Sequence, residues 1–515
     1  MPELIADPNV NPKLYSRGWF RLFEILPGAL VWTVLILPFL FAKIAPDFVT
    51  IFVLVFDMYW ILKSLNYGII LLVGYRNLKK TINTDWNKRL LELPLKHNDL
   101  FWEDLWHVVI LPTYKEPVAV LEASIQSVVD AKYNSRKIIF VLATEARDAE
   151  NAQQIGAKLT TQFAKYFHLF LVTKHPDGIV GEVKAKGANA TWAAKQLVEH
   201  LQNSDISFNK TIVTTADADS RFHPEYFARL SYSYMTAENR LRTAFQPVPM
   251  YFNNIWDAPM ISRIYAFGTT FWNLVQSVRT YRLITFATHA MALSTLIEMD
   301  YWCTSIVNED SRQFYRGFFH FNGRFKVIPL FIPIYMDAVH AGSFRSSLHN
   351  LYLQQQRWAY GVEHFPYIVL ESWRRHKIPL LNRLAIIWRA FEGNFNWATS
   401  SYFITIVGWI PFVINHEYNQ RLIALNYQNY IRNILIVAWV GLFISIYLTL
   451  KILPHPPAHR QSIFSRLSMI GQWILVPVVA IFFSSIPAID SQTRLMLGKY
   501  LGFRVTAKVA VKNND

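Results

Sequence analysis

The feature that most constrains this chain is a set of five long apolar runs, two near its beginning and three near its end. A helix needs about 20 apolar residues to cross a hydrocarbon core of ~30 Å. A polar stretch much too long for a loop separates the second run from the third. The sequence therefore predicts a multi-pass membrane protein with a large domain inserted between two groups of helices. The runs are residues 26–42, 49–75, 397–414, 434–450 and 470–486.

Composition and charge agree with a membrane protein. Hydrophobic residues make up 52% of the chain and charged residues only 17%, whereas charged residues are about a quarter of a soluble domain. The net charge of +15 is concentrated in basic clusters beside the apolar runs, a pattern typical of cytoplasmic loops. We find no lysine- and arginine-rich stripe on a soluble helix, so nucleic acid is not an expected partner. The expected partner is the lipid bilayer of the plasma (inner) membrane, with the inserted domain in the cytoplasm.

Single residues add further limits. The one cysteine, Cys303, excludes an internal disulfide framework and fits a reducing compartment. The first 24 residues are polar and carry three prolines, which does not fit a cleavable signal peptide. Asp57 and Lys63 lie inside the second apolar run, where ionisable groups usually face a protein interior or a water-filled path. A structural pair, a snorkelling lysine and a translocation path are all open readings.

Residues 102–345 have the character of an α/β domain. Strand-like runs alternate with helical runs of 10–15 residues, which indicates a largely parallel sheet. Ligands of such sheets bind beyond the carboxyl ends of the strands. The expected strands are residues 107–112, 137–143, 168–173 and 211–215, and the expected helices 118–130, 149–165 and 188–200. After the domain, residues 348–375 and 380–391 are predicted to be amphipathic helices at the membrane interface.

Carboxylates follow the expected strands. The fourth strand ends at Asp217 and Asp219, and two carboxylates on such a loop can share a divalent cation with a diphosphate. The pattern is weak alone, because close aspartates are common. Lys184 and Lys186 precede a helix, and lysines at a helix N-terminus favour phosphate. A solvated basic turn is the alternative for the two lysines.

Two further motifs lie beyond the four strands. In Glu309-Asp310, an acidic residue near apolar walls could take a proton from a hydroxyl, although such a pair is more often a helix start. In Gln354-x-x-Arg357-Trp358, the arginine suits a phosphate and the tryptophan offers a face to a sugar ring. A polar-aromatic interface helix is the alternative for the second motif.

These motifs, in this order, resemble the membrane-embedded family 2 glycosyltransferases, the group of cellulose, hyaluronan and chitin synthases. The resemblance spans roughly residues 102–361 and begins with the Pro-Thr-Tyr-Lys-Glu-Pro stretch at 112–117. A sixth motif lies in the tail, where residues 503–508 are similar to the Phe-x-Val-Thr-x-Lys gating loop of cellulose synthases. The implied fold is an α/β GT-A (Rossmann-like) cytoplasmic domain inserted between N-terminal and C-terminal transmembrane helices.

The resemblance also implies an activity and a site. A UDP-sugar would be the donor and a growing polysaccharide the acceptor, and Asp217 and Asp219 would hold Mg²⁺ or Mn²⁺. Asp310, beside Glu309, would be the catalytic base. Where many relatives carry aspartates for the nucleotide, this chain has Glu145 and Asp148. The implied substrate-binding residues are Thr113, Tyr114, Glu116, Glu145, Lys184, Lys186, Asp217, His289, Gln354, Arg357, Trp358, Thr506 and Lys508; a core histidine is an equal alternative for His289.

The expected division of the chain has five parts. They are residues 1–96 with two transmembrane helices, 97–346 as the glycosyltransferase domain, 347–395 as interface helices, 396–488 as transmembrane helices and 489–515 as a tail. Three crossings after a cytoplasmic domain would leave the tail outside. Either 470–486 does not cross completely, or one crossing is miscounted, or the tail match is accidental.

Two other functions are open besides processive polymer synthesis with translocation. The first is transfer of a single sugar to a lipid acceptor. The second is a membrane channel or scaffold whose α/β domain senses a nucleotide.

Overall fold

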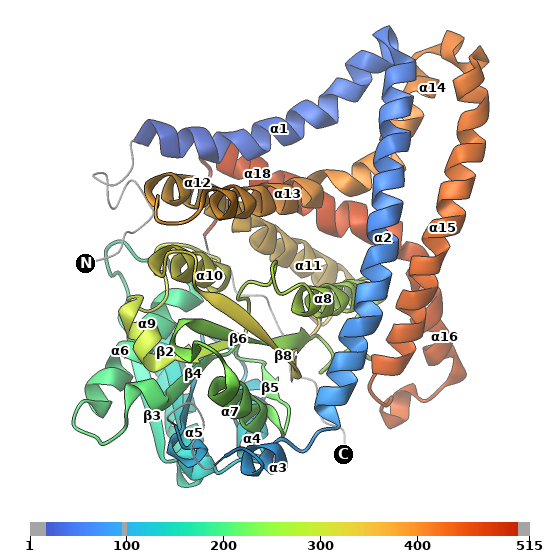
Figure 1. Cartoon of the computed structure of the whole chain (residues 1–515). Coiled ribbons are helices and arrows are strands. Elements are labelled where there is room, and N and C mark those ends of the chain that lie inside the picture. The colour runs from blue at the N-terminus through green and yellow to red at the C-terminus, as the bar shows by residue number, and fades with distance from the viewer. Residues whose placement is uncertain (1–16, 95–99, 503–515) are drawn as a thin grey trace.

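A mixed eight-stranded sheet occupies the polar stretch of the chain in the computed structural model, which describes residues 17–94 and 100–502 (Figure 1). The strand order is β3-β2-β1-β4-β7-β6-β8-β5. The four strands predicted from the sequence are confirmed, and all pair in parallel. They are β1 (Trp106–Pro112), β2 (Ile138–Glu145), β3 (Leu169–His175) and β4 (Thr211–Thr215).

The second half of the sheet was not foreseen. There β7 pairs antiparallel with β4 and β6, β8 pairs parallel with β6, and β5 pairs antiparallel with β8. Prolines inside β6 and β8 weaken their strand signal, and β5 and β7 are short. The expectation of a largely parallel sheet therefore holds for β1 to β4 only. The additional strands are β5 (Arg221–Phe222), β6 (Thr243–Met250), β7 (His289–Ala292) and β8 (Lys326–Tyr335).

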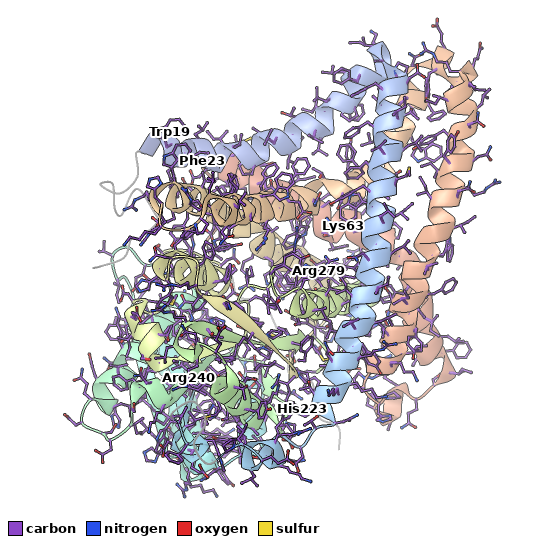
Figure 2. The ribbon with its side chains drawn as sticks, viewed as in Figure 1. Trp19, Phe23, Lys63, His223, Arg240 and Arg279 are labelled. Carbon is purple, nitrogen blue, oxygen red and sulfur yellow. The ribbon has the colours of Figure 1, made fainter. Side chains whose placement is uncertain are left out.

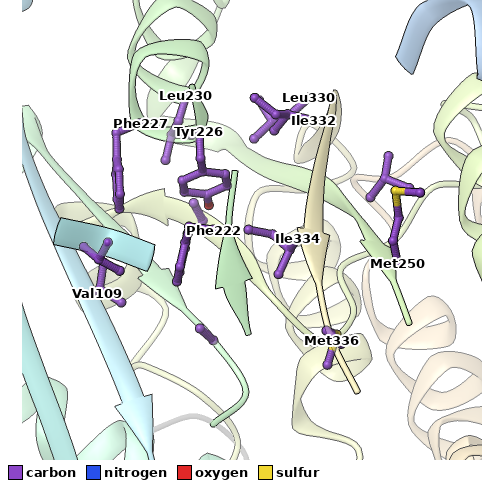
Figure 3. Close-up of a cluster of buried hydrophobic side chains, with 14 of the residues drawn as sticks. Val109, Phe222, Tyr226, Phe227, Leu230, Met250, Leu330, Ile332, Ile334 and Met336 are labelled. Carbon is purple, nitrogen blue, oxygen red and sulfur yellow. The ribbon is translucent and has the colours of Figure 1, made fainter. Parts of the chain in front are cut away.

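Alternation along the central strands builds a core on each face of the sheet. In β1, Val109 and Leu111 belong to one buried cluster, while Val108 and Ile110 belong to the other, as the two-residue period of a strand requires. Figure 3 shows part of the first cluster, with side chains of α7 against those of β8. The helices around the sheet are α3 (Trp86–Leu91), α4 (Val118–Val129), α5 (Ala149–Phe163), α6 (Lys186–Leu201), α7 (Tyr226–Thr236), α8 (Met260–Val278), α9 (Leu293–Glu298) and α10 (Glu309–His320).

Within residues 17–94 and 100–502, five helical segments are long and apolar enough to cross a membrane. They are 18–44 in α1 (Arg17–Ile44), α2 (Pro46–Ile82), 380–414 in α13 (Leu380–Thr405) and α14 (Ile410–Ile414), α15 (Leu422–Ile452), and 463–496 in α16 (Ile463–Gly471), α17 (Val476–Ala480) and α18 (Ile486–Met496). Figure 1 shows α2 and α15 side by side, extending beyond the sheet.

The helices that follow the sheet differ from the sequence prediction in their bounds. The predicted helix 348–375 is divided into α11 (Phe344–Ala359) and α12 (His364–Arg374) by a 3₁₀ turn. The predicted interface helix 380–391 is the first part of α13, which continues without a break to Thr405. No proline lies within α13 to end a helix at residue 391.

The ends of α1, α2 and α15 that lie far from the sheet are tied together. α1 ends at Ile44 and α2 begins at Pro46, so a single residue separates the two helices. Arg421, just before α15, forms an ion pair with Asp47, and the Tyr418 hydroxyl donates to Thr50 Oγ1 at 2.6 Å. At the other end α2 packs on α8, where a Cβ on Gly74 would lie 3.0 Å from the Leu274 carbonyl oxygen.

The last apolar segment, α16 to α18, contacts the rest of the protein near the sheet at both of its ends. Near its beginning, Arg263 of α8 donates to Gln472 Oε1 at 2.9 Å. Near its end, Tyr352 of α11 donates to Asp490 at 3.1 Å, and Ser491 Oγ donates to the Gln356 carbonyl at 2.6 Å. A segment that is hydrogen-bonded to α8 near one end and to α11 near the other differs from an isolated crossing helix. This arrangement favours the first of the three readings of the tail problem, an incomplete crossing.

The two ionisable groups of α2 have separate surroundings. Lys63 forms a 2.7 Å ion pair with Glu392 of α13. Its partner is therefore a residue far along the chain and not Asp57. Asp57 is buried, and its Oδ1 has no hydrogen-bond partner among the described residues. Asp57 and Lys63 therefore do not form a pair with each other.

We predict that acid destabilises the fold through His107, which burial in β1 keeps neutral by lowering its pKa from 6.5 to about 3. Below pH 6.5 the unfolded chain binds a proton that the folded chain excludes, so this contribution is complete above pH 6.5 and falls by about 1.4 kcal/mol per pH unit below it. His107→Leu should therefore reduce the loss of thermal stability between about pH 7.5 and about pH 5 in detergent. Ser231 Oγ, which bonds His107 at 2.8 Å, keeps Tyr133 as a partner. The same substitution at exposed His349 should leave the loss unchanged, and equal acid sensitivity of both variants would contradict the assignment.

Candidate active site

Four chain segments meet beyond the carboxyl end of β4, and three of them contribute charged side chains. They are the loop after β4, the first turn of α6, the first turn of α10 and the loop before β7. Lys186 Nζ lies 2.7 Å from Asp217 Oδ1 and 3.4 Å from the Ala287 carbonyl. Asp217, Lys186, Glu309 and Asp310 are therefore neighbours, although more than 120 residues separate Lys186 from Asp310 along the chain.

The Asp217-Ala218-Asp219 loop is held by hydrogen bonds from three directions. The Asp217 amide donates to Ser220 Oγ at 3.1 Å, and Ser124 Oγ of α4 donates to the Ala218 carbonyl at 2.6 Å. The Asp337 amide, just after β8, donates to Asp219 Oδ2 at 2.9 Å. Asp219 is thereby fixed in a buried position, and the loop is preorganised to present its carboxylates.

Backbone amides position the carboxylate of Asp310. The amide of Ala287 donates to Oδ2 at 2.7 Å, and the amide of Ser311 donates to Oδ1 at 2.7 Å. Thr285 Oγ1 donates to the Asp310 carbonyl at 2.6 Å. An ionised carboxylate offers about four lone-pair sites, so each oxygen can accept one more bond. The carboxylate is therefore oriented and can still accept a hydrogen bond from a further group.

Glu309 differs from Asp310 in its environment. Burial, and then the neighbouring Asp310 carboxylate, raise the pKa of Glu309 to about 8, although Lys186 acts in the opposite direction. Glu309 is therefore mostly protonated at neutral pH. The pair divides into one neutral acid and one carboxylate held by amides, which is how environment separates the roles of adjacent carboxyl groups.

Lys186 is the positive charge of the site. Burial alone would lower its pKa, but Asp217, Glu309 and Asp310 outweigh burial and raise the pKa above its usual range. The ammonium group therefore stays charged in a place with little solvent. The other predicted lysine, Lys184, forms an exposed ion pair with Asp177 at 2.7 Å instead.

Aromatic side chains lie beside the carboxylates. Trp358 of α11 packs against Tyr251 and Tyr265, with ring centroids 5.8 Å and 6.3 Å apart. Burial, and then Asp217, Asp219 and Asp310, hold the pKa of Tyr251 well above its usual range. Sequence reasoning missed both tyrosines. The signal for Tyr251 was its place directly after β6, a strand that the prolines concealed.

The motif on α11 is joined to the first turn of α10. Asn308, which precedes Glu309, donates through Nδ2 to the Arg357 carbonyl at 3.1 Å. Gln355 Nε2 donates to Gln354 Oε1 at 3.4 Å. Gln356 Nε2 donates to Asp490 of α18. A shift of α11 would therefore disturb the first turn of α10, where Asp310 lies. Gln356 also bonds Asp490, so α18 is linked to α11 by a hydrogen bond.

A small pocket lies at the ends of β1 and β2, separate from the carboxylate cluster. Glu116 accepts from the Thr113 hydroxyl at 2.7 Å and from the Tyr114 amide. Arg147 lies over the Tyr114 ring at 4.0 Å and pairs with Glu145. The predicted residues Thr113, Tyr114, Glu116 and Glu145 therefore gather here. The polar lining consists of Thr113, Lys115, Thr144, Glu145, Asp148 and Asn151.

Among the described residues, Lys184 and His289 lie at neither place. His289 is buried, accepts a hydrogen bond from Trp302 Nε1 at 3.2 Å and contacts the Ala287 carbonyl at 3.3 Å. Burial, followed by Lys186, lowers its pKa to about 3, and this environment favours the core-histidine reading. Thr506 and Lys508 lie outside the described residues.

The carboxylates of Asp217 and Asp219 fit a divalent cation in part. Hard cations such as Mg²⁺ take oxygen ligands and commonly use one or two carboxylates together with substrate phosphates and water. Within residues 17–94 and 100–502, no group of three or more His, Cys, Asp or Glu side chains could hold a metal ion. Any cation at this loop would therefore depend on the bound substrate for the rest of its ligands.

Comparison with known proteins gives weak structural similarity. No family model matches the sequence, and no curated protein matches it. A mannosyltransferase from Pyrobaculum calidifontis, solved with GDP-Man and Mn²⁺, aligns with 13% identity over 87% of this chain and 100% of its own, at a TM-score of 0.42. Residues 1–349 of S. aureus TarS align with 11% identity over 78% of this chain and 94% of that one, at a TM-score of 0.36. Similarity at this level does not establish a shared function.

We predict that Gly187→Ala destabilises the protein, because a Cβ there would lie 2.6 Å from the Cys303 carbonyl oxygen and 2.8 Å from Glu309 Cβ. Overpacking of this kind costs about 1–3 kcal/mol. The control is Gly268→Ala in α8, where no atom lies within 4 Å and alanine should stabilise the helix by about 0.5–1 kcal/mol. Thermal unfolding midpoints in detergent measure both. A Gly187→Ala protein as stable as the wild type would mean that α6 and α10 are not in close contact.

Proposed function

We propose that this chain is a membrane-bound, metal-dependent inverting glycosyltransferase that transfers sugar from a nucleotide diphosphate sugar. The observation that carries the proposal is the placement of Asp310, a carboxylate oriented by two amides, beside Lys186 and the Asp217–Asp219 loop. Such a site offers a base on one side and positive charge for a diphosphate on the other. The resemblance of the motifs to the family 2 enzymes supports the same reaction and a GT-A fold.

Each residue has a role in a single displacement. Asp310 accepts the proton of the acceptor hydroxyl as the new bond to the sugar forms, and the bond from the sugar to the nucleotide diphosphate breaks. Asp217 and Asp219 would hold Mg²⁺ or Mn²⁺, which neutralises charge on the leaving diphosphate when bound. Lys186 supplies further positive charge. Glu309 in its neutral form avoids a third negative charge beside Asp217 and Asp310.

The donor would extend from the aspartate loop to the pocket at the ends of β1 and β2. In this proposal Thr113, Tyr114, Glu116 and Glu145 contact the nucleotide. The pocket and the aspartate loop follow neighbouring strands of one sheet, where ligands of α/β sheets bind. Uridine is the nucleoside that the resemblance implies.

The acceptor would approach from α11. Trp358 with Tyr251 and Tyr265 forms an aromatic platform suited to a sugar ring, and Gln354 and Arg357 lie on the same helix. We propose a growing polysaccharide as the acceptor, passed through the membrane helices as it extends. Transfer of one sugar to a lipid is the second candidate, because the membrane helices contact the domain close to the site.

We propose four crossings: α1, α2, α13 with α14, and α15. An even number returns the chain to the side of the sheet domain, in line with the contacts of α16 to α18 at both ends. The sheet domain and the tail would then share the cytoplasmic side of the plasma membrane, as a gating role for Thr506 and Lys508 requires. The division at residues 96, 346, 395 and 488 stays a proposal.

The direct test is incubation of the purified protein with a panel of radiolabelled UDP-sugars and Mg²⁺ or Mn²⁺. The expected product is a polymer; a labelled lipid would select single transfer, and no product from any donor would contradict the proposed function. EDTA should abolish transfer, and so should Asp219→Asn, because a neutral amide is a much weaker ligand for a hard cation. Full activity in EDTA would contradict the metal assignment.

We predict that Asp310→Asn lowers transfer by roughly 10²–10⁴-fold, the usual contribution of a general base. UDP affinity measured by calorimetry should be unchanged, because the carboxylate faces the acceptor in this proposal. Glu309→Gln should lose much less, since the amide resembles the neutral acid that burial favours. Asp130→Asn on the exposed end of α4 is the control. Loss of UDP affinity along with activity would make Asp310 a nucleotide-binding or structural residue.

A further inference from the structure

Basic side chains gather where α2 and α13 meet the end of α8. In the described part of the chain, Lys63 and Arg282 both pair with Glu392, at 2.7 Å and 2.9 Å. Arg389 donates to the Tyr281 carbonyl, and Arg279 donates to Asn66 Oδ1 at 2.6 Å. Two of these four cations thus share one carboxylate, and the other two bond neutral oxygens. We call Lys63, Arg279, Arg282 and Arg389 the basic junction.

The depth of the basic junction matches a headgroup layer. Lys63 lies 17 residues after Pro46, which is about 26 Å along a helix, close to the ~30 Å thickness of a hydrocarbon core. Figure 2 shows Lys63 on α2 between the membrane helices, and Arg279 nearer to the sheet domain. The aromatic side chains of Trp272, Tyr281 and Trp388 are exposed around it, as is usual at a membrane interface.

The basic junction has capacity for a further anion. The Nε atom of Arg279 is buried and has no hydrogen-bond partner among the described residues. Arginine presents its donors in a planar fork that suits phosphate oxygens. Among the described residues, the recorded ion pairs of the basic junction both use Glu392.

A short segment connects the basic junction to the catalytic centre. It begins at Arg279 after α8, passes Tyr281 and Arg282, and ends at Thr288 before β7. Its far end supplies the Ala287 amide that orients Asp310 and the Ala287 carbonyl that contacts Lys186. A group bound at the basic junction is therefore ten residues or fewer from the amide that holds the base.

We propose that the basic junction is a binding site for the phosphate of a membrane lipid, and that its occupancy steadies residues 279–288 and so the position of Asp310. The shared chemistry is a phosphate ester on an apolar chain, which either a bilayer phospholipid or a prenyl phosphate acceptor supplies. The binding itself is independent of the proposed sugar transfer; the effect on turnover rests on it.

Native mass spectrometry of the full-length protein tests the binding. The probes are phosphatidylglycerol and farnesyl phosphate, with phosphatidylcholine, farnesol and inorganic phosphate for comparison. We expect retention of the two anionic lipids by the wild type and at least tenfold weaker retention by Arg279→Gln and Arg282→Gln, since a hydrogen bond to a charged group contributes about that much. Lys80→Gln, an exposed cation on the same helix α2, should not change retention. Arg279→Lys, which keeps the charge, should recover part of it and shows that loss in Arg279→Gln is not misfolding.

Turnover in nanodiscs separates the two lipids. Stimulation by phosphatidylglycerol, which is not consumed, assigns the site to a bilayer lipid, and formation of a labelled farnesyl product assigns it to an acceptor. Equal retention of lipid by the wild type and both glutamine variants would overturn the proposal, as would farnesol binding as tightly as farnesyl phosphate. Absence of sugar transfer with lipid retention intact would contradict the proposed function and leave the binding site standing.

Discussion

The ion pair between Lys186 and Asp217 is the interaction on which the candidate site depends. Asp219 and Glu309 are buried nearby, and buried carboxylates are costly unless they are paired, hydrogen-bonded or protonated. The structure uses all three solutions: Lys186 pairs with Asp217, amides bind Asp219 and Asp310, and Glu309 is protonated at neutral pH. Gly187 makes the arrangement possible, because a larger residue beside Lys186 would collide with Glu309.

The first half of the fold was predictable because its signals are local. The strands β1 to β4 are apolar runs that end in turns. The motif residue Asp217 comes just after the end of a strand, and Asp310 lies at the start of a helix. The second half depends on contacts that no local pattern encodes. β6 and β8 contain prolines and are stabilised by their pairing with each other. Tyr251, which directly follows β6, lies against Trp358 because β6 is part of the sheet.

The choice between the two lysines shows the same limit. Lys184 and Lys186 are two residues apart and chemically alike, so sequence could not rank them. The helix α6 begins at Lys186, and its first turn points at the loop after β4. Lys184 precedes the helix, in a loop where Asp177 is its partner. The difference between the two lysines depends on where α6 begins. The exact end residue of a helix is its least predictable feature.

Hydropathy alone left the membrane topology undetermined, because α16 to α18 satisfies the length and composition of a span. The hydrogen-bond partners of its polar residues add information that hydropathy lacks. Gln472 bonds α8, while Asp490 and Ser491 bond α11, so each end of the segment is held by the part of the chain that carries the sheet. The partner of a polar side chain near the end of an apolar helix can therefore indicate on which side of the membrane that end lies, provided that the side of the partner helix is known. For this chain the partners agree with the proposed even number of crossings, and Asp490 and Ser491 lie beside the helix that carries Trp358.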